Sequence, residues 1–247
     1  MPASQVGALA LLERLRTLRL VDLTHPLHPA MPYWPGDGYG PFHYQSINTH
    51  AQHGKAAGVF SMPEHMGTHL DAPSHFAPDG LSIERLPLDS LLVPAIVLDI
   101  AAKAALDPGA LLEPPDIDAW EQRHGRVPTG GLVFVHSGWG QHWADPAAFR
   151  NADGAGTMRF PAVSEAAARR LIERGIVGLG LDTLSADNGA APSSPCHRVV
   201  HAAGGYILEN LANLDSLPEQ GAFVLVAPIP IAGGTGAPAR VLAFCDL

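Results

Sequence analysis

The residues between positions 65 and 76 carry the side chains best suited to do chemistry. They read HMGTHLDAPSHF and place four potential metal ligands within eleven residues: His65, His69, Asp71 and His75. Imidazole and carboxylate groups together suit a divalent transition metal such as Zn²⁺, Mn²⁺ or Fe²⁺. The cluster therefore predicts a metal site, and a metal with open positions can activate water for hydrolysis.

The spacing of these residues indicates how the segment must fold for its side chains to meet. On a strand, His69 and Asp71 point to one face, about 6.6 Å apart along the chain. His65 and His69 would be about 13 Å apart on a straight strand, which is too far for two ligands with bonds of ~2 Å. Gly67 and Pro73 disfavour a helix. We therefore expect a bend at Gly67 that brings His65 beside His69.

A second group of polar residues lies downstream and comprises Cys196, His197, His201 and Glu209. Glu209 ends an apolar stretch, so it is expected at the end of a strand, where a buried carboxylate needs a partner or a metal. Taken alone, this group fits a surface loop better than a site. Cys196 fits a buried, inert thiol.

Short apolar segments bounded by turn residues predict the elements that must position these side chains. Strands are expected at 20–23, 95–100, 132–136, 176–181, 223–227 and 241–244, a helix at 5–18, and a loop at 29–45. Two further helices have clear ends, one from Asp116 as N-cap to Gly125 and one from Ser164 as N-cap to Gly175. No repeat or long linker divides the chain, so we expect a single mixed α/β domain over residues 1–247.

Composition excludes several classes of protein. The chain has 247 residues, of which 47% are hydrophobic and 16% charged, which is enough for one substantial core. No apolar run reaches the ~20 residues of a membrane helix. The net charge of −9 and the absence of a Lys/Arg cluster disfavour nucleic acid or an anionic membrane surface as a partner. Two cysteines, and a beginning unlike a signal peptide, predict a cytoplasmic protein.

The stretch from His65 to Phe76 resembles the H-x-G-T-H-x-D-x-P-x-H-F signature of the metal-dependent cyclase family, which includes bacterial kynurenine formamidase and isatin hydrolase. Other segments resemble the family in the same order: WPGD at 34–37, DTLSAD at 182–187, His197 twelve residues before ENL at 209–211, and GGTG at 233–236. The resemblance covers most of the chain. It implies a swivelling β/β/α fold that is strand-rich with few helices, usually assembled as a homo-oligomer, a dimer or a tetramer.

The resemblance also implies a ligand set for one or two divalent ions, Zn or Mn. His65, His69 and Asp71 would hold the first ion. Asp71 could bridge to a second ion held by His197 and Glu209.

The remaining implied roles concern catalysis. His75 would be the general acid/base, and Trp34 would line the pocket of a small-molecule substrate. The implied reaction is hydrolysis of an amide, lactam or related acyl bond of a small aromatic substrate by metal-activated water. A longer middle, 141–161, is more like the isatin-hydrolase branch, and His201 stands where the family pattern leads us to expect an aliphatic residue.

Other interpretations compete with this one. Ser137 follows a predicted strand but lies outside a G-x-S-x-G elbow, and Cys196 beside His197 is no stronger as a nucleophile. The glycines at 233–236 lack the lysine and spacing of a phosphate loop. A non-catalytic metal- or ligand-binding protein of the same fold is also possible. Replacing His75 by alanine would discriminate, because loss of a general base removes rate without removing metal.

Overall fold

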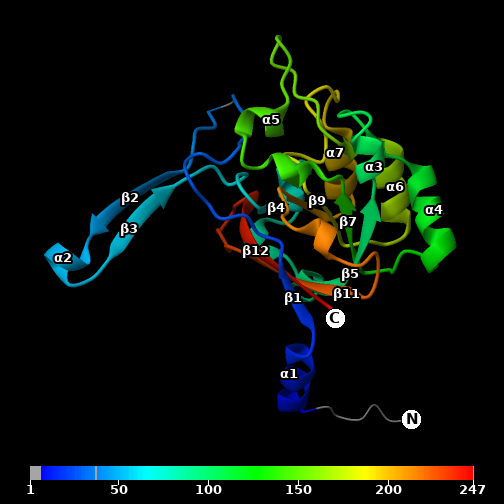
Figure 1. The fold of residues 1–247 in the computed structure, drawn as a ribbon. Helices are drawn as coiled ribbons and strands as arrows, with labels where there is room; N and C mark the ends of the chain where they lie inside the picture. Colours follow the sequence, from blue (N-terminus) through cyan, green and yellow to red (C-terminus); the bar gives the residue numbers. More distant parts are fainter. Residues whose placement is uncertain (1–6, 37, 247) are drawn as a thin grey trace.

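The computed structural model describes residues 7–36 and 38–246 and is built around a sheet that closes on itself (Figure 1). The strand order is β1-β12-β11-β5-β7-β9-β10-β4, and β4 also pairs with β12. Seven strands therefore form a barrel-like ring, with β1 on its outer edge. The strands of this sheet are β1 (Arg19–Asp22), β4 (His69–Asp71), β5 (Leu92–Asp99), β7 (Leu132–His136), β9 (Gly178–Leu181), β10 (Tyr206–Glu209), β11 (Ala222–Pro228) and β12 (Gly236–Cys245).

Alternate side chains of the strands enter two different hydrophobic cores. On β5, Ala95 and Val97 point into the barrel, whereas Ile96 and Leu98 point outward toward the helices. This is the period of two that a strand with both faces buried must show. The helices α4 (Pro114–His124), α6 (Glu165–Glu173) and α7 (Pro195–Ala202) contribute side chains to the outer core, at the right of Figure 1. The predicted strand-rich α/β fold is confirmed.

A third core, here called the aromatic core, is separate from the other two. It is built from the loop around residue 31 and from the 139–160 region, which includes α5 (Pro146–Arg150). Its buried members are Met31, Phe42, Met66, Trp139, Trp143, Phe149, Met158, Phe160 and Leu184. Tyr33 and Trp34 pack against it. The long middle of the chain thus packs against the loop that carries Tyr33 and Trp34.

Two helices test the predicted helix starts. Ser164 is the N-cap of α6, and its hydroxyl accepts a hydrogen bond from the backbone N–H of Ala167, as predicted. The predicted N-cap at Asp116 is wrong: α4 begins three residues earlier, with Glu113 as N-cap. Asp116 instead accepts a hydrogen bond from the backbone N–H of Glu113, the reciprocal half of a capping box. Pro114 at the first helical position fits this earlier start.

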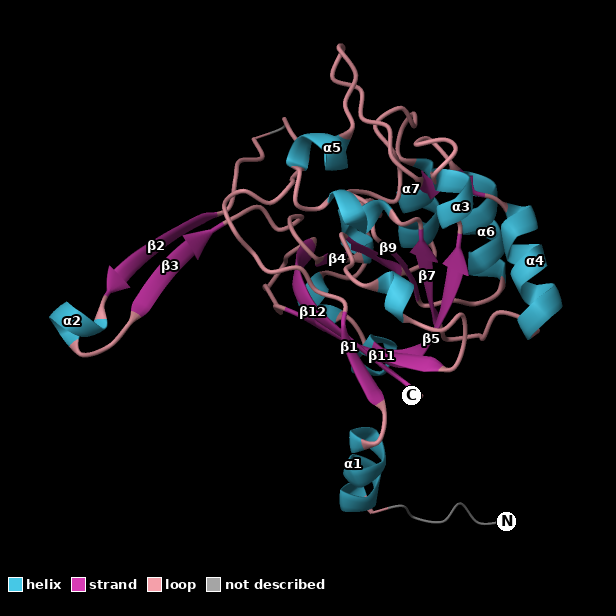
Figure 2. Ribbon diagram, viewed as in Figure 1, coloured by secondary structure: helices cyan, strands magenta, loops and turns pink. Residues whose placement is uncertain are grey.

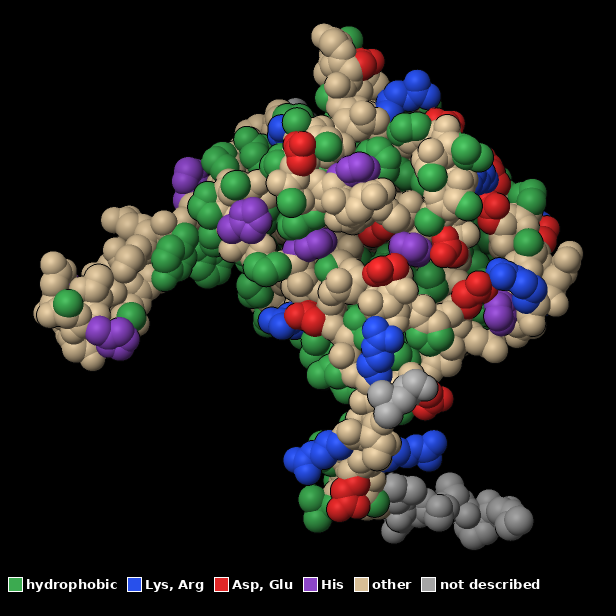
Figure 3. Space-filling model, in the orientation of Figure 1, with side chains coloured by type: hydrophobic (Ala, Val, Ile, Leu, Met, Phe, Trp, Pro, Cys, Tyr) green, Lys and Arg blue, Asp and Glu red, His purple; other side chains and the backbone are tan. Residues whose placement is uncertain are grey.

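A β-hairpin projects from the body; its first three residues lie in the loop predicted over 29–45, and the sequence predicted no element for the rest of it. Strands β2 (His43–Asn48) and β3 (Ala57–Ser61) pair antiparallel around the short helix α2 (His50–His53), and Figure 3 shows this arm extending away from the rest of the chain. Tyr44 and Phe60 are directly paired on it and remain exposed. The arm was missed because its polar and apolar residues lack the alternation of a half-buried strand.

The remaining short elements are α1 (Ala8–Arg16), α3 (Ala101–Ala104), β6 (Leu111–Leu112) and β8 (Ala162–Val163). Within the described residues there are twelve strands and seven α-helices, drawn in magenta and cyan in Figure 2. The helix predicted at 5–18 corresponds to α1, with positions 5 and 6 outside the described residues. Among the described helices, none has the length and apolar character needed to cross a membrane.

Candidate active site

The predicted bend lies at Gly67, whose φ of +66° is in the left-handed region. Glycine adopts this conformation without the steric cost that a Cβ atom imposes. The chain bends between His65 and the three-residue strand β4, which begins at His69 and ends at Asp71. The rings of His65 and His69 are consequently 5.6 Å apart, centroid to centroid, instead of lying at opposite ends of a straight strand.

His65 and His69 flank one oxygen of the Asp71 carboxylate. The Nδ1 atom of His65 lies 2.5 Å from Asp71 Oδ1, and the Nε2 atom of His69 lies 3.0 Å from it. The other nitrogen of each ring interacts with a residue that is not one of these three. His69 Nδ1 donates a hydrogen bond to the Gly67 carbonyl at 2.9 Å, and His65 Nε2 lies 2.9 Å from the Thr235 hydroxyl. The rings are therefore fixed with one nitrogen facing the carboxylate.

His197 and Glu209 approach this group from different elements. His197 comes from α7, and its Nε2 atom lies 3.3 Å from Asp71 Oδ2 and 3.1 Å from Glu209 Oε1. Glu209 is the last residue of β10 and is the register partner of His69 on β4. Its Oε2 atom lies 3.6 Å from His69 Nε2. The second polar group, which the sequence alone assigned to a surface loop, is buried and lies on α7 and at the end of β10.

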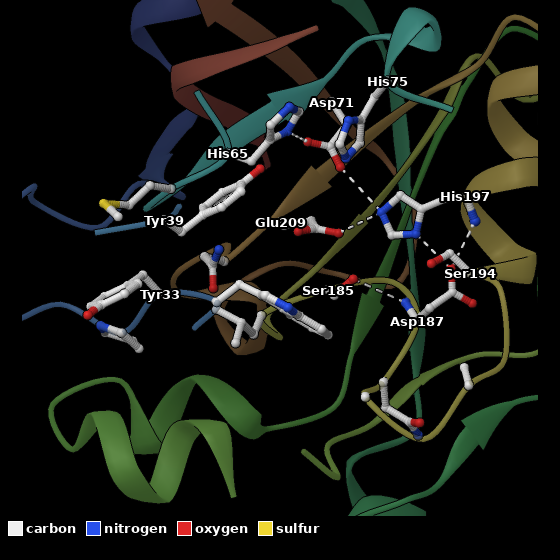
Figure 4. Close-up of a pocket in the computed structure, with 18 of the residues that line it drawn as sticks. Tyr33, Tyr39, His65, Asp71, His75, Ser185, Asp187, Ser194, His197 and Glu209 are labelled. Carbon is white, nitrogen blue, oxygen red and sulfur yellow. Dashed lines mark hydrogen bonds and ion pairs between the residues drawn. The ribbon is translucent and has the colours of Figure 1, made fainter. Parts of the chain in front are cut away.

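The five side chains form two groups with a shared member. His65, His69 and Asp71 offer ligand atoms within 4.8 Å of one another, and so do Asp71, His197 and Glu209. Asp71 belongs to both groups because its two oxygens face different histidines, as Figure 4 shows from the side of the pocket. The structure thus brings together all five residues that the sequence proposed as metal ligands.

Asp187 holds His197 in place, a function the sequence did not reveal. Asp187 Oδ2 lies 2.7 Å from His197 Nδ1, and the carboxylate also accepts the backbone N–H groups of Cys196 and His197 at 3.0 Å. A carboxylate behind a ligating histidine fixes the ring orientation and raises its basicity. Asp187 is the last residue of the DTLSAD segment, which was the available signal.

The electrostatics of the site favour positive charge. Burial by itself lowers the pKa of His69, but the Asp71 and Glu209 carboxylates outweigh it and raise that pKa to about 9. Burial by itself raises the pKa of Asp71, but His69 and His65 hold it well below its usual range. His69 Nε2 is buried without a hydrogen-bond partner although it points at two carboxylates. Such nitrogen and oxygen donors fit a divalent cation.

His75 lies beside these groups without belonging to either. It ends a 3₁₀ turn, Pro73–His75, and its ring stacks on that of His65 with centroids 3.8 Å apart. Burial, with a smaller effect from His65, lowers the pKa of His75 to about 4. The imidazole is therefore neutral at pH 7 and retains a lone pair that can accept a proton.

A cavity of about 320 Å³ opens onto the site, and Trp34, the residue expected to line the substrate pocket, forms part of its wall. Four of the five ligand-type residues, all except His69, form one part of its wall together with His75. Aromatic side chains form another part, namely Tyr33, Trp34, Tyr39 and Phe76. Asp37 of the W-P-G-D segment lies outside the described residues. The volume is within the range of small-molecule pockets.

The two competing nucleophiles are unsuited to attack a substrate, because one is hydrogen-bonded in the interior and the other is a buried thiol. The Ser137 hydroxyl is buried and donates a hydrogen bond to Asp182 at 2.5 Å. Burial raises the pKa of the Cys196 thiol well above its usual value, which disfavours the reactive thiolate. The glycine segment at 233–236 packs against the site instead of forming a phosphate loop: Thr235 contacts His65, and a Cβ atom at Gly236 would collide with the His65 ring.

The closed sheet, the helices on its outer face and the shared-carboxylate site define a family. The family model described as "Putative cyclase" matches residues 21–188. The chain belongs to this cyclase family, which confirms the resemblance seen in the motifs.

Individual relatives give the same result. The isatin hydrolase of Roseibium aggregatum is 38% identical over 190 residues, covering 73% of this chain and 72% of that protein. The kynurenine formamidase of Paracidovorax citrulli is 30% identical over 230 residues, covering 90% and 95%. A solved isatin hydrolase bound to the product analogue thioisatinate superimposes with a TM-score of 0.93 at 31% identity, over 98% of this chain and 100% of that one.

Proposed function

We propose that this chain is a metal-dependent hydrolase that cleaves the C–N bond of an amide or lactam in a small aromatic substrate. The observation that carries the proposal is the pair of ligand groups that share Asp71, placed beside a pocket with aromatic walls. Relatives named isatin hydrolase and kynurenine formamidase support hydrolysis of a C–N bond outside peptides.

The residues divide the work of this reaction. His65, His69 and Asp71 would hold a divalent ion, Zn or Mn, which lowers the pKa of water and polarises a carbonyl when bound. His75 would take a proton from the attacking water and return it to the leaving nitrogen. Trp34 would place its flat, apolar ring against an aryl group of the substrate.

The number of ions is one or two, and the shared carboxylate allows either. If two ions bind, His65→Ala should remove one of them and Glu209→Gln the other, leaving one ion per chain in each variant. If one ion binds, both substitutions should weaken the same binding event. Metal titration of the apoprotein by calorimetry distinguishes these stoichiometries.

Hydrolysis assays test the proposed activity. With Zn²⁺ or Mn²⁺ added, the protein should hydrolyse isatin or N-formylkynurenine, lose activity on chelation and regain it when the ion is restored. Activity that survives chelation would refute the metal mechanism.

The role of His75 has its own test. His75→Ala should retain metal and lose about 10²- to 10⁴-fold in kcat. His53→Ala, on the exposed tip of the arm, is the matched control and should change neither metal content nor rate. Loss of metal from His75→Ala would make His75 a ligand, and metal binding by the wild type without turnover would favour the binding-protein alternative.

A homo-oligomeric state, dimer or tetramer, belongs to the same proposal. The arm and α1 both project from the body (Figure 3). The arm exposes Tyr44, Val59 and Phe60, and α1 exposes Leu9. Exposed apolar side chains on a projecting hairpin are typical of a contact surface. Light scattering on the purified protein measures the oligomeric state directly. The cytoplasmic location stays a prediction.

A further inference from the structure

The long middle of the chain folds back on itself between β7 and β8. After α5, Asn151 adopts a left-handed φ of 43°, and an isolated bridge joins Ala152 to Met158. The returning segment, residues 157–161, carries Met158 and Phe160 into the aromatic core, where their exposed fractions are 3% and 0%. These residues are thus fixed by burial although they belong to a long connection.

The returning segment and α5 support two aromatic residues of the pocket wall. The edge of the Phe160 ring meets the Trp34 ring with centroids 6.4 Å apart and planes at 84°, a favourable aromatic contact. The guanidinium of Arg150 lies over the Tyr33 ring, 5.9 Å from its centroid. Both rings come from the turn-rich loop around residue 34, so this packing limits the orientations that they can adopt.

The returning segment also supports a second part of the wall, residues 188–191. Asn188 Nδ2 donates a hydrogen bond to the Phe160 carbonyl at 3.4 Å. Gly189 approaches the backbone so closely that a Cβ atom there would lie 2.8 Å from the Met158 nitrogen and 2.9 Å from its carbonyl oxygen. Asn188, Gly189 and Trp34 all line the cavity, whereas Phe160 is buried behind it.

We propose that Phe160 is a positioning residue that sets the width of the pocket between Trp34 and the 188–191 segment, and thereby determines how tightly a flat aromatic substrate is held. This inference rests on the proposed function because it concerns the substrate of the same site. Phe160 lies behind Trp34, away from the ligand groups, so its contribution is to substrate binding and not to the chemical step.

A pair of substitutions of equal size tests this role. Phe160→Leu should raise the KM for isatin roughly 3- to 10-fold, the effect of freeing one ordered side chain at a binding surface, with kcat nearly unchanged. Phe149→Leu removes the same volume from the same aromatic core, but Phe149 packs on Trp143 instead of Trp34, so its KM should remain at the wild-type value. Equal KM values in the two variants would overturn the inference.

Binding measurements separate this inference from the proposed function. Calorimetric titration of isatin into the metal-free proteins should show the same difference in affinity between Phe160→Leu and Phe149→Leu, without any turnover. Absence of hydrolysis by the metal-loaded wild type would refute the proposed function alone. If Phe160→Leu fails to fold, Phe160→Met, which keeps an apolar side chain of similar volume but removes the ring edge that meets Trp34, should produce the same rise in KM. An unchanged KM would contradict the inference.

Discussion

Asp187 is bonded to His197 at two points, since its carboxylate accepts hydrogen bonds from both the backbone N–H and the ring Nδ1 of that histidine. The ring is thereby directed with Nε2 toward Asp71 and Glu209. Asp187→Asn removes the charge that supports the ligating tautomer, so metal affinity should fall about 10- to 100-fold. Calorimetric metal titration measures the change. Asp153→Asn, on an exposed turn, is the control, and equal affinities in both variants would contradict this role.

Gly67 provides a test of the bend that joins His65 to His69. Gly67→Ala places a Cβ atom at a φ of +66°, 2.6 Å from Leu27 Cδ2, and should cost about 1–2 kcal/mol of stability together with part of the metal affinity. Gly54→Ala, at a φ of +67° on the arm with open space around it, imposes similar backbone strain far from the site. Urea unfolding and metal titration of both variants should show comparable destabilisation but weakened metal binding only for Gly67→Ala.

The sequence predicted the parts of the fold that local pattern determines. The strand expected at 132–136 is β7, because its apolar residues are all buried in one core or the other. The strand expected at 241–244 is only the second half of β12, since Gly236 and Pro238 at its beginning are unfavourable in strands. The first half of β12 forms because it pairs with β4, and Gly236 lies opposite Asp71, which is 165 residues earlier in the chain. Such a pairing leaves no local signal.

The candidate site also combines residues that lie close together in the sequence with residues that only the fold brings to them. His65, His69 and Asp71 could be proposed together because seven residues of sequence contain them, with Gly67 as the turn. His197 could not be placed by pattern alone, since α7 begins at Pro195 after Ser194 in a left-handed conformation, and helix starts are read mainly from a capping side chain. The antiparallel register of β10 on β4 places Glu209 opposite His69, and α7, which packs against β10, carries His197 to the same place. Topology, not spacing, completes the second ligand group.

His25 predicts a pH dependence of stability. Its ring stacks on Trp143 with centroids 4.0 Å apart, and burial, assisted by His28, lowers its pKa from 6.5 to about 4. The unfolded chain therefore binds a proton below pH 6.5 that the native state does not bind until about pH 4, so stability falls as the pH decreases across this interval. His25→Phe retains the stack on Trp143 but cannot bind a proton. Between pH 7 and 4.5, its free energy of unfolding should therefore fall by about 1–2 kcal/mol less than that of the wild type, a figure that allows for the partial contact of His25 with solvent. Urea unfolding of the metal-free proteins measures this, and parallel pH profiles would contradict it.

His201 is a buried imidazole with neither ring nitrogen hydrogen-bonded, and it is 1% exposed beside His75, His197 and Phe76. A buried polar group without a partner costs about 1–3 kcal/mol, whereas leucine fills a similar volume without that cost. His201→Leu should therefore stabilise the metal-free protein by about 1–3 kcal/mol in urea unfolding. His201→Gln retains the polarity at similar size and should give no gain. A destabilised His201→Leu protein would mean that these nitrogens bind a partner in solution, and repeating the unfolding with Zn²⁺ present would show whether that partner depends on the metal.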